Sequence, residues 1–326
     1  KILNIGWHTA RLCAVETYMD CPYYEQLQYI GDTRIQAMVT YYNSSDRRLA
    51  RNALNIMDQS QISEGLTLSR HPSYTPQIIP TFSMWYIHLL DDYRMHNDDE
   101  EFIREKVVRS RPAMRWFAGY QDEGGSIRHM PYWVFTDWVD SNGWDSGVAP
   151  MGADGSSAIV DIQYYWTLSV AARLEQDLGS AEVAAEYTAR AVQLKETIQR
   201  KYWSSERGLY ADRKELDLFS QHANALAILA GLVPAESVQA FAVRVMEGRD
   251  MAPASIYFKY YLHLAGVEAG LGSDYFSWLS KWEENIRLGL TTWAEMSDVP
   301  RSRSDCHAWG ASPNVEVFRS VLGIRS

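Results

Sequence analysis

The fold is decided by residues 158–203, which read AIVDIQYYWTLSVAARLEQDL, then GS, then AEVAAEYTARAVQLKETIQRKYW. In the first block, bulky residues recur at steps of three and four, as at Ile159, Ile162, Trp166 and Val170. In the second block the same spacing runs through Ala184, Tyr187, Ala191, Leu194 and Ile198. This period indicates two amphipathic helices, and Gly179 ends the first of them.

The same periodicity extends in both directions along the chain. It predicts ten further helical blocks, over residues 3–18, 32–43, 46–60, 79–96, 100–121, 219–230, 235–247, 254–269, 273–285 and 312–322. Strand signals are confined to 208–210 and 126–134, where short hairpins are possible. Long non-periodic stretches cover 62–80, 122–154 and 289–311, and loops of such length usually carry function.

About twelve helices in six hairpins suit an all-α (α/α)6 toroid, an inner ring of helices inside an outer ring. The alternative is an α-solenoid of helical pairs, but no short signature recurs at a fixed period. Neither a linker nor a composition shift divides residues 1–326, so we expect a single domain with long active-site loops. The chain opens at Lys1 without a Met or an apolar leader, as expected of a mature or excised segment.

Charge and composition exclude several classes of function. The chain has 31 basic and 41 acidic residues and a net charge of −10, which disfavours nucleic acid and anionic membranes as partners. The longest nearly apolar stretch, 223–235, is too short to span a bilayer. Cys13, Cys21 and Cys306 lack the spacing of a zinc knuckle or a disulfide framework, so no metal or other cofactor is expected. Compartment (periplasmic, secreted or cytoplasmic) and oligomeric state stay open.

Aromatic residues are abundant, with 12 Trp, 20 Tyr and 9 Phe. A Trp-rich core is the simplest explanation, but ring faces also stack on the apolar faces of sugars. The run Trp133-Val-Phe-Thr-Asp-Trp138-Val-Asp140 interleaves rings and carboxylates in a glycine-rich stretch. Rings can stack on a sugar and carboxylates can bind its hydroxyls, so this run has the composition of a sugar-binding loop.

Two further groups of residues suggest acid–base chemistry. Asp20, Glu25 and Asp32 fall within thirteen residues on a stretch broken by Pro22 and Gly31, so we expect their side chains to converge from a loop. An N-cap role is the simpler interpretation for Asp32 alone. Crowded carboxylates raise one another's pKa, which suits a general acid.

The second group lies in the last long loop, where Thr-Trp-Ala-Glu295 is followed by His307-Ala-Trp. A closed ring would bring this loop beside the beginning of the chain. Motifs of metalloproteases, serine hydrolases, P-loop proteins and dinucleotide-binding proteins are missing from the sequence. The remaining histidines show no metal-ligand spacing, so we predict no metal site.

These motifs resemble the α-L-rhamnosidases of glycoside hydrolase family 78. The resemblance rests on Asp20-Cys-Pro-x-x-Glu25 with Gly-Asp32, on Asp-Trp138-Val, on Thr-Trp-x-Glu295 and on His307-Ala-Trp, in that order along the chain. It implies an (α/α)6 barrel that in the family is flanked by β-sandwich domains, so the chain is expected to be the barrel alone.

The resemblance also implies roles for individual residues. Glu25 would be the general acid and Glu295, in a more open loop that keeps it ionised, the general base of an inverting hydrolysis of terminal α-L-rhamnosyl units. Rhamnose would be bound by Asp20, Asp32, His307 and Trp138, with Trp85 as a weaker match for a second aromatic wall. The family usually has Arg and Trp where this chain has Tyr24 and Tyr29, so recognition of the sugar hydroxyls is expected to differ there.

Two other functions stay open at this point. One is another (α/α)6 activity, such as that of a glucuronyl hydrolase or a glucoamylase-like enzyme. The other is a catalytically weakened carbohydrate-binding toroid, although a binding module needs no second carboxylate across the sugar. Cys21 and Cys306 each adjoin a proposed site residue, so they are candidates to pair, against the simpler expectation of two unrelated thiols.

Overall fold

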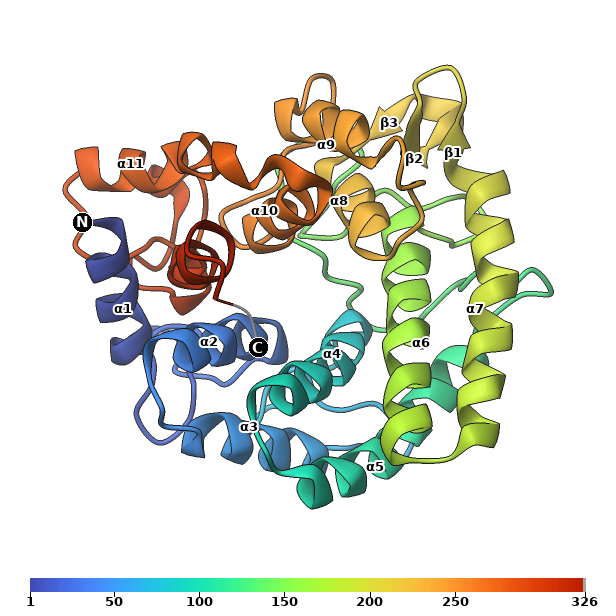
Figure 1. Ribbon diagram of the computed structural model, residues 1–326, viewed down its shortest axis with the longest axis horizontal. Helices are drawn as coiled ribbons and strands as arrows, with labels where there is room; N and C mark the ends of the chain where they lie inside the picture. Colours follow the sequence, from blue (N-terminus) through green and yellow to red (C-terminus); the bar gives the residue numbers. More distant parts are fainter. Residues whose placement is uncertain (325–326) are drawn as a thin grey trace.

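The helices of the computed structural model, which describes residues 1–324, alternate between an outer and an inner ring (Figure 1). The outer helices are α1 (Ile2–Leu12), α3 (Arg48–Gln59), α5 (Glu100–Ala118), α7 (Ala181–Tyr202), α9 (Val238–Glu247) and α11 (Ser280–Arg287). The inner helices are α2 (Ile30–Asn43), α4 (Pro80–His96), α6 (Ala158–Leu178), α8 (Gln221–Leu229), α10 (Lys259–Gly266) and α12 (Pro313–Glu316). Each inner helix contacts the next, and α12 returns to α2, so the predicted (α/α)6 toroid is confirmed.

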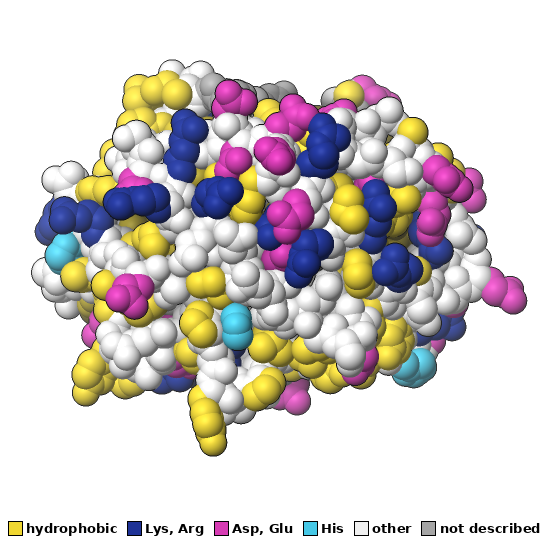
Figure 2. Space-filling model, turned by 90° about the horizontal axis from the view of Figure 1, so that it is seen from below, with side chains coloured by type: hydrophobic (Ala, Val, Ile, Leu, Met, Phe, Trp, Pro, Cys, Tyr) yellow, Lys and Arg dark blue, Asp and Glu magenta, His cyan; other side chains and the backbone are white. Residues whose placement is uncertain are grey.

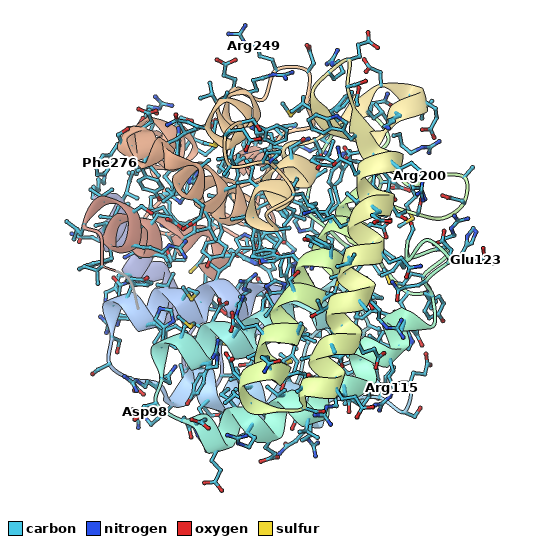
Figure 3. All side chains as sticks on the ribbon, turned by 45° about the vertical axis from the view of Figure 1, so that its right-hand side comes forward. Asp98, Arg115, Glu123, Arg200, Arg249 and Phe276 are labelled. Carbon is cyan, nitrogen blue, oxygen red and sulfur yellow. The ribbon has the colours of Figure 1, made fainter. Side chains whose placement is uncertain are left out.

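The two rings differ in how much of each helix is buried. Inner helix α2 is buried continuously from Ile30 to Val39, including the polar side chains on that stretch. Outer helix α3 buries one stripe, Ala50, Ala53, Leu54, Met57 and Asp58, and turns its other faces to solvent. Helices that are apolar on several faces are buried, whereas amphipathic ones cover them. The α6–α7 hairpin, at the front of Figure 3, repeats this pairing of an inner and an outer helix.

Several predicted boundaries were wrong, for local reasons. The first helix ends at Leu12 instead of residue 18, because the chain then folds back through a hydrogen bond from Met19 N to Cys13 O. The predicted helices 254–269 and 273–285 become α10, a π turn, a 3₁₀ segment and α11, since Gly270 adopts a φ of 88°. The last block is a short α12 followed by a π turn, Val317–Val321.

The sheet content matches the limited strand signal. A three-stranded antiparallel sheet consists of β1 (Trp203–Ser204), β2 (Leu209–Arg213) and β3 (Leu218–Phe219), around the predicted hairpin at 208–210. Within the described residues, the stretch 126–134 contributes no named strand, only an isolated bridge between Gln121 and Ile127.

Connection length alternates around the ring. Inner helices lead to the following outer helices through short turns, such as 44–47, 97–99 and 179–180. Five of the six outer helices lead to the next inner helix through longer segments: 13–29, 60–79, 119–157, 203–220 and 288–312. The exception is 248–258, between α9 and α10, which is shorter than the connection 267–279 between α10 and α11. The long segments therefore gather at one end of the toroid, where the inner helices begin. They include the three predicted functional loops and the loop that carries Asp20 and Glu25.

The ring closes where α1, at the left of Figure 1, contacts the segment Ala308–Ala311 and α12. The Thr9 hydroxyl donates a hydrogen bond to Ile5 O at 2.8 Å and accepts one from Trp293 N at 3.1 Å. The Asn314 amide donates to Leu3 O at 2.9 Å. Gly6 lets these segments approach, because a Cβ at this position would overlap the Asn314 side-chain oxygen.

The face drawn in Figure 2 carries basic and acidic side chains interspersed among apolar and uncharged ones, without a large patch of one sign. A search of residues 1–324 finds no helix with the length and apolar character needed to cross a membrane.

Gly6→Ala tests the closure of the ring. An alanine inside a helix normally stabilises it by about 1 kcal/mol relative to glycine. At Gly6 the overlap with Asn314 should reverse the sign and destabilise the protein by about 1–3 kcal/mol, measured by chemical denaturation. Gly272→Ala is the matched control, because a Cβ there would meet its nearest atom at 3.9 Å. Equal effects of the two substitutions would contradict the role of Gly6.

Candidate active site

A cavity of about 540 Å³ opens among the long loops. Seven of the nine predicted site residues line it: Asp20, Glu25, Tyr29, Asp32, Trp138, Glu295 and His307. They come from the loop before α2, from α2 itself, from the loop before α6 and from the loop before α12. The toroid therefore brings together residues from both ends of the sequence.

Asp20, Asp32 and His307 form the buried floor of the cavity, and each is at most 2% exposed. His307 Nε2 lies 2.8 Å from Asp32 Oδ1. Burial raises the pKa of Asp32 well above its usual value and lowers the pKa of His307, so both shifts disfavour a fully charged pair. The N-cap interpretation of Asp32 was wrong, since Tyr29 occupies that position and Asp32 lies in the first turn of α2.

Asp20 is fixed by its own loop. Its carboxylate accepts hydrogen bonds from Leu27 N at 2.9 Å and from the Cys21 thiol at 2.9 Å, and its carbonyl accepts one from Ala308 N. Burial raises the pKa of Asp20, while the nearby His307 opposes this shift. The contact with Ala308 joins the first and last loops of the site directly.

Glu295 is buried, which corrects the expectation that it lies in a more open loop. Its backbone N–H donates to Ser304 O at 2.9 Å, and Trp309 Nε1 donates to its carbonyl at 2.9 Å. Burial raises the pKa of Glu295, with His307 and Arg303 acting in the opposite direction. Its Oε2 is buried and has no hydrogen-bond partner among the described residues, so it is available to an incoming group.

Glu25 is half-buried and forms an ion pair with Arg303 at 2.5 Å. The same guanidinium nitrogen lies 3.8 Å from Glu295 Oε1. The two Oε1 atoms can be no further apart than the sum of these distances, just below the ~6.5–9.5 Å expected between the carboxyl groups of an inverting glycosidase. Arg303 therefore occupies the space between the two carboxylates that a substrate and a water molecule would need.

An aromatic wall stands beside these carboxylates. Trp138 is half-buried and lines the cavity with Trp133 and Phe135, at ring-centroid distances of 5.9 and 5.1 Å. Trp309 lines the cavity as well. Aromatic faces next to hydrogen-bonding groups suit the two kinds of surface that a sugar presents.

Asp137, next to Trp138, does not contribute to the sugar-binding surface that the loop composition suggested. It is fully buried and does not line the cavity; its carboxylate accepts hydrogen bonds from Ser255 N at 2.9 Å and Ser255 Oγ at 2.5 Å. His222 Nε2 lies 2.7 Å from the same carboxylate. These contacts anchor the Trp138 loop to α8 and to the segment before α10.

Two predicted site residues lie elsewhere. Trp85 is buried within α4, where it stacks on Tyr261 at 4.5 Å with the Arg34 guanidinium over its ring, so it is a core residue and not a cavity wall. Tyr24 is exposed and does not line the cavity. Its ring lies beneath the guanidinium of Arg303 at 5.8 Å. The Arg303 guanidinium, which comes from a distant loop, therefore lies beside the position where the family usually has an arginine.

Sequence reasoning missed three arginines that line the cavity: Arg70, Arg301 and Arg303. Arg70 Nη1 donates to the Tyr29 hydroxyl at 2.5 Å, and Arg301 pairs with Asp140 at 2.6 Å. None of the three lies in a motif. Their occurrence in long loops was the signal that could have drawn attention to them.

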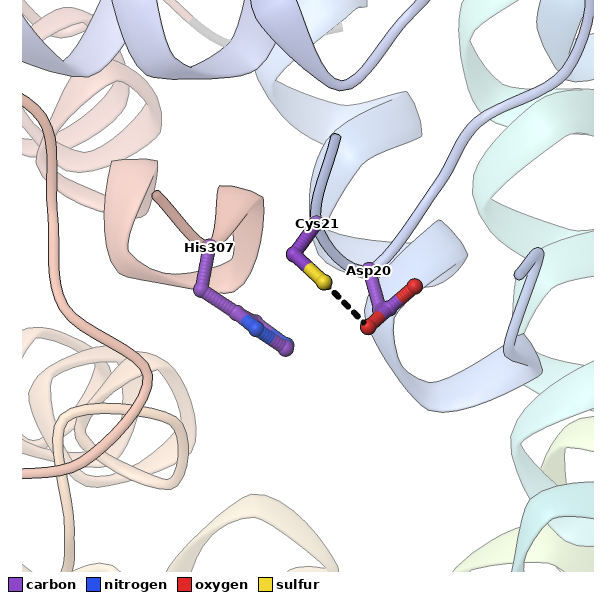
Figure 4. Close-up of side chains that lie close together, drawn as sticks. All are labelled: Asp20, Cys21 and His307. Carbon is purple, nitrogen blue, oxygen red and sulfur yellow. Dashed lines mark hydrogen bonds between the residues drawn. The ribbon is translucent and has the colours of Figure 1, made fainter. Parts of the chain in front are cut away.

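Asp20, Cys21 and His307 offer potential metal-ligand atoms within 4.8 Å of one another (Figure 4). A thiol and an imidazole together would suit Zn²⁺ best. Asp20 already accepts two hydrogen bonds, and His307 contacts Asp32.

All three cysteines are free thiols, and the Cys13 thiol lies 4.0 Å from the carbonyl of Cys306.

An α/α toroid whose loops hold two acidic side chains beside an aromatic wall is an arrangement typical of glycoside hydrolases. Residues 1–251 match the family model of the bacterial alpha-L-rhamnosidase 6 hairpin glycosidase domain. The chain belongs to this family, which confirms the resemblance seen in the sequence. A search of curated proteins gave no match.

Solved structures share the fold of this chain. The family 78 rhamnosidase of a Bacillus species is 24% identical with a TM-score of 0.88, and the match covers 98% of this chain and 34% of that enzyme. A rhamnosidase from Klebsiella oxytoca with rhamnose bound is 20% identical with a TM-score of 0.86, over 99% of this chain and 63% of that one. The family 63 mannosylglycerate hydrolase of Thermus thermophilus matches at 10% identity and a TM-score of 0.70, over 98% of this chain and 100% of that one. The chain thus spans less than two thirds of the two rhamnosidases.

Trp138→Ala should separate a substrate wall from a core residue. We expect KM to rise about tenfold or more, because the stacking surface is lost, with little change in melting temperature. Trp85→Ala is the contrasting variant, since its ring is buried in the core and its loss should lower the melting temperature strongly. Steady-state kinetics and thermal denaturation check both. A large loss of stability with an unchanged KM for Trp138→Ala would show that Trp138 is a core residue.

Proposed function

We propose that this domain hydrolyses terminal α-L-rhamnosyl units of glycosides or polysaccharides with inversion, with Glu25 as general acid and Glu295 as general base. The observation that carries the proposal is the placement of both carboxylates at one cavity, bridged by Arg303, beside the floor of Asp20, Asp32 and His307. The family assignment and the rhamnose bound to the Klebsiella relative support the choice of sugar.

In this mechanism the floor residues bind the rhamnose hydroxyls and Trp138 stacks on the ring. Glu25 donates a proton to the glycosidic oxygen as the bond from that oxygen to the anomeric carbon breaks. Glu295 removes a proton from a water molecule that attacks the same carbon from the opposite face. Burial raises the pKa of Glu295, so it is a stronger base than a solvated carboxylate. A general base is most effective when its pKa lies near the working pH.

Arg303 must leave Glu25 before the reaction. The ion pair at 2.5 Å occupies the Glu25 carboxylate, whereas a general acid must contact the glycosidic oxygen. The Arg303 side chain is 49% exposed, so it can move toward solvent without opening the core. In the proposed mechanism, substrate binding moves Arg303 out of the space between the two carboxylates.

The test of the substrate class is a screen of aryl α-L-rhamnoside against other aryl glycosides, with Glu295→Gln as the inactive control. Cleavage of the rhamnoside at a kcat/KM well above that of every other glycoside is expected. Preference for an aryl glucuronide or glucoside would favour another (α/α)6 glycosidase. Binding of rhamnose without turnover of any glycoside would favour a carbohydrate-binding toroid.

The two carboxylates should respond differently to the leaving group. Glu25→Gln should slow substrates with poor leaving groups by about 100-fold or more and activated aryl glycosides far less, because only the former need the proton. Glu295→Gln should slow both alike, since both need the activated water. Proton NMR of the first-formed sugar should show the anomer opposite to that of the substrate. Retention of configuration, or indifference to both substitutions, would contradict the assignment.

A further inference from the structure

The cavity carries a concentration of positive charge that the rest of the chain does not suggest. The protein has a net charge of −10, yet Arg70, Arg301 and Arg303 all line this one cavity. Arg70 comes from the loop before α4, and the other two come from the loop before α12. The arginines of separate loops thus meet at a site where the sequence predicted only acids and rings.

Acidic and basic side chains lie at different depths of the cavity. The acidic floor is buried, with Asp20 at 1% and Asp32 at 2% exposure. The side chains of Arg301 and Arg303 are 61% and 49% exposed. The carboxyl groups of the floor are therefore enclosed, while Arg301 and Arg303 lie at the rim, each beside a carboxylate and open to solvent. A chain end that enters this cavity puts its terminal sugar on the floor and its next unit at the rim.

The cations also flank the proposed general acid. Arg303 pairs with Glu25 directly. Arg70 reaches the same region through Tyr29, with its guanidinium 5.4 Å from the centre of the Tyr29 ring and a hydrogen bond to the hydroxyl. A general acid must touch the oxygen of the leaving group. Groups that surround Glu25 on the rim side therefore face the leaving group and not the sugar that is released.

The Arg70 guanidinium has an N–H group without a hydrogen-bond partner among the described residues. Among residues 1–324, no carboxylate lies within 4.0 Å of its guanidinium, and its Nε is buried without a hydrogen-bond partner. Arg301 and Arg303 do have carboxylate partners, but both arginine side chains are exposed to solvent. Exposed ion pairs contribute little free energy, so either arginine can leave its partner for a carboxylate of the substrate at small cost. A planar guanidinium with free N–H groups fits a carboxylate better than it fits a neutral hydroxyl.

We propose that the unit next to the cleaved bond carries a carboxylate, as a uronic acid does, and that Arg70 binds it, with Arg303 moving from Glu25 toward the same group. This inference rests on the proposed function and narrows its substrate class to rhamnosyl units attached to an acidic sugar. The anionic substrate then removes the cation from Glu25 as it binds. The Glu25 carboxyl group is thereby freed to contact the glycosidic oxygen when a suitable leaving group is in place.

The experiment compares a rhamnosyl-uronic acid disaccharide with its carboxyl-reduced, neutral counterpart. The wild-type kcat/KM should be about tenfold or more higher for the acidic disaccharide at low ionic strength, and this preference should shrink as salt is added. Arg70→Gln should lower kcat/KM for the acidic disaccharide about tenfold more than for the neutral one. Arg249→Gln is the matched control, because that side chain is 82% exposed and lies at the edge of the molecule in Figure 3. Equal wild-type rates on the two disaccharides, or equal effects of the Arg70 and Arg249 variants, would overturn the inference.

A binding measurement keeps this inference separate from the proposed function. If no rhamnoside is turned over, the proposed function fails, but calorimetric titration with methyl glucuronoside and methyl glucoside still decides whether the rim binds a carboxylate. Tighter binding of the glucuronoside, lost in Arg70→Gln, supports the inference, and equal binding overturns it. Methyl glucoside 6-sulfate is the third ligand. Tighter binding of the sulfate ester than of the glucuronoside would overturn the assignment to a carboxylate.

Discussion

The contact between Asp32 and His307 is the interaction on which the site depends, because it joins the first inner helix to the last loop of the chain. It can form only if the ring closes, and closure in turn needs the tight approach of α1 to the end of the chain around Gly6 and Thr9. Since each partner is buried, neither is easily replaced by water. A defect in closure would therefore disorganise the floor of the cavity before it unfolded the individual helices.

Helices and loops were predictable because their signals are local. The apolar spacing in α6 and α7 needs only a few neighbouring residues to be recognised, and Gly179 marks the break between them. Boundaries failed where a tertiary contact or a glycine conformation decided them, as after Leu12 and at Gly270. The motifs placed seven of nine predicted residues at one cavity. Trp85 failed because nothing in its local sequence distinguishes an inward-facing core tryptophan from a cavity wall.

Electrostatic environment was the least predictable property of the site. Glu295 was expected in a more open loop and Glu25 among crowded acids, but the structure buries Glu295 and pairs Glu25 with Arg303. The reason is that the surroundings of a carboxyl group depend on its burial and on charges from distant loops, neither of which is visible in a short motif. The substitution of Tyr24 for the arginine usual in the family illustrates this point. This chain lacks the positive charge at Tyr24, but the Arg303 guanidinium from another loop lies over the ring of that tyrosine.

The alternation of long and short connections divides the toroid into two ends with different freedom to vary. At the end of the short turns, such as 179–180, the chain has few residues with which to absorb an insertion, and its task is to keep consecutive helices in contact. At the cavity end, each long segment is held at both ends by packed helices, so its middle can change in length and composition while the ring persists. New specificities can therefore arise by exchanging one loop at a time, with the helical ring serving as a constant frame for different sugars.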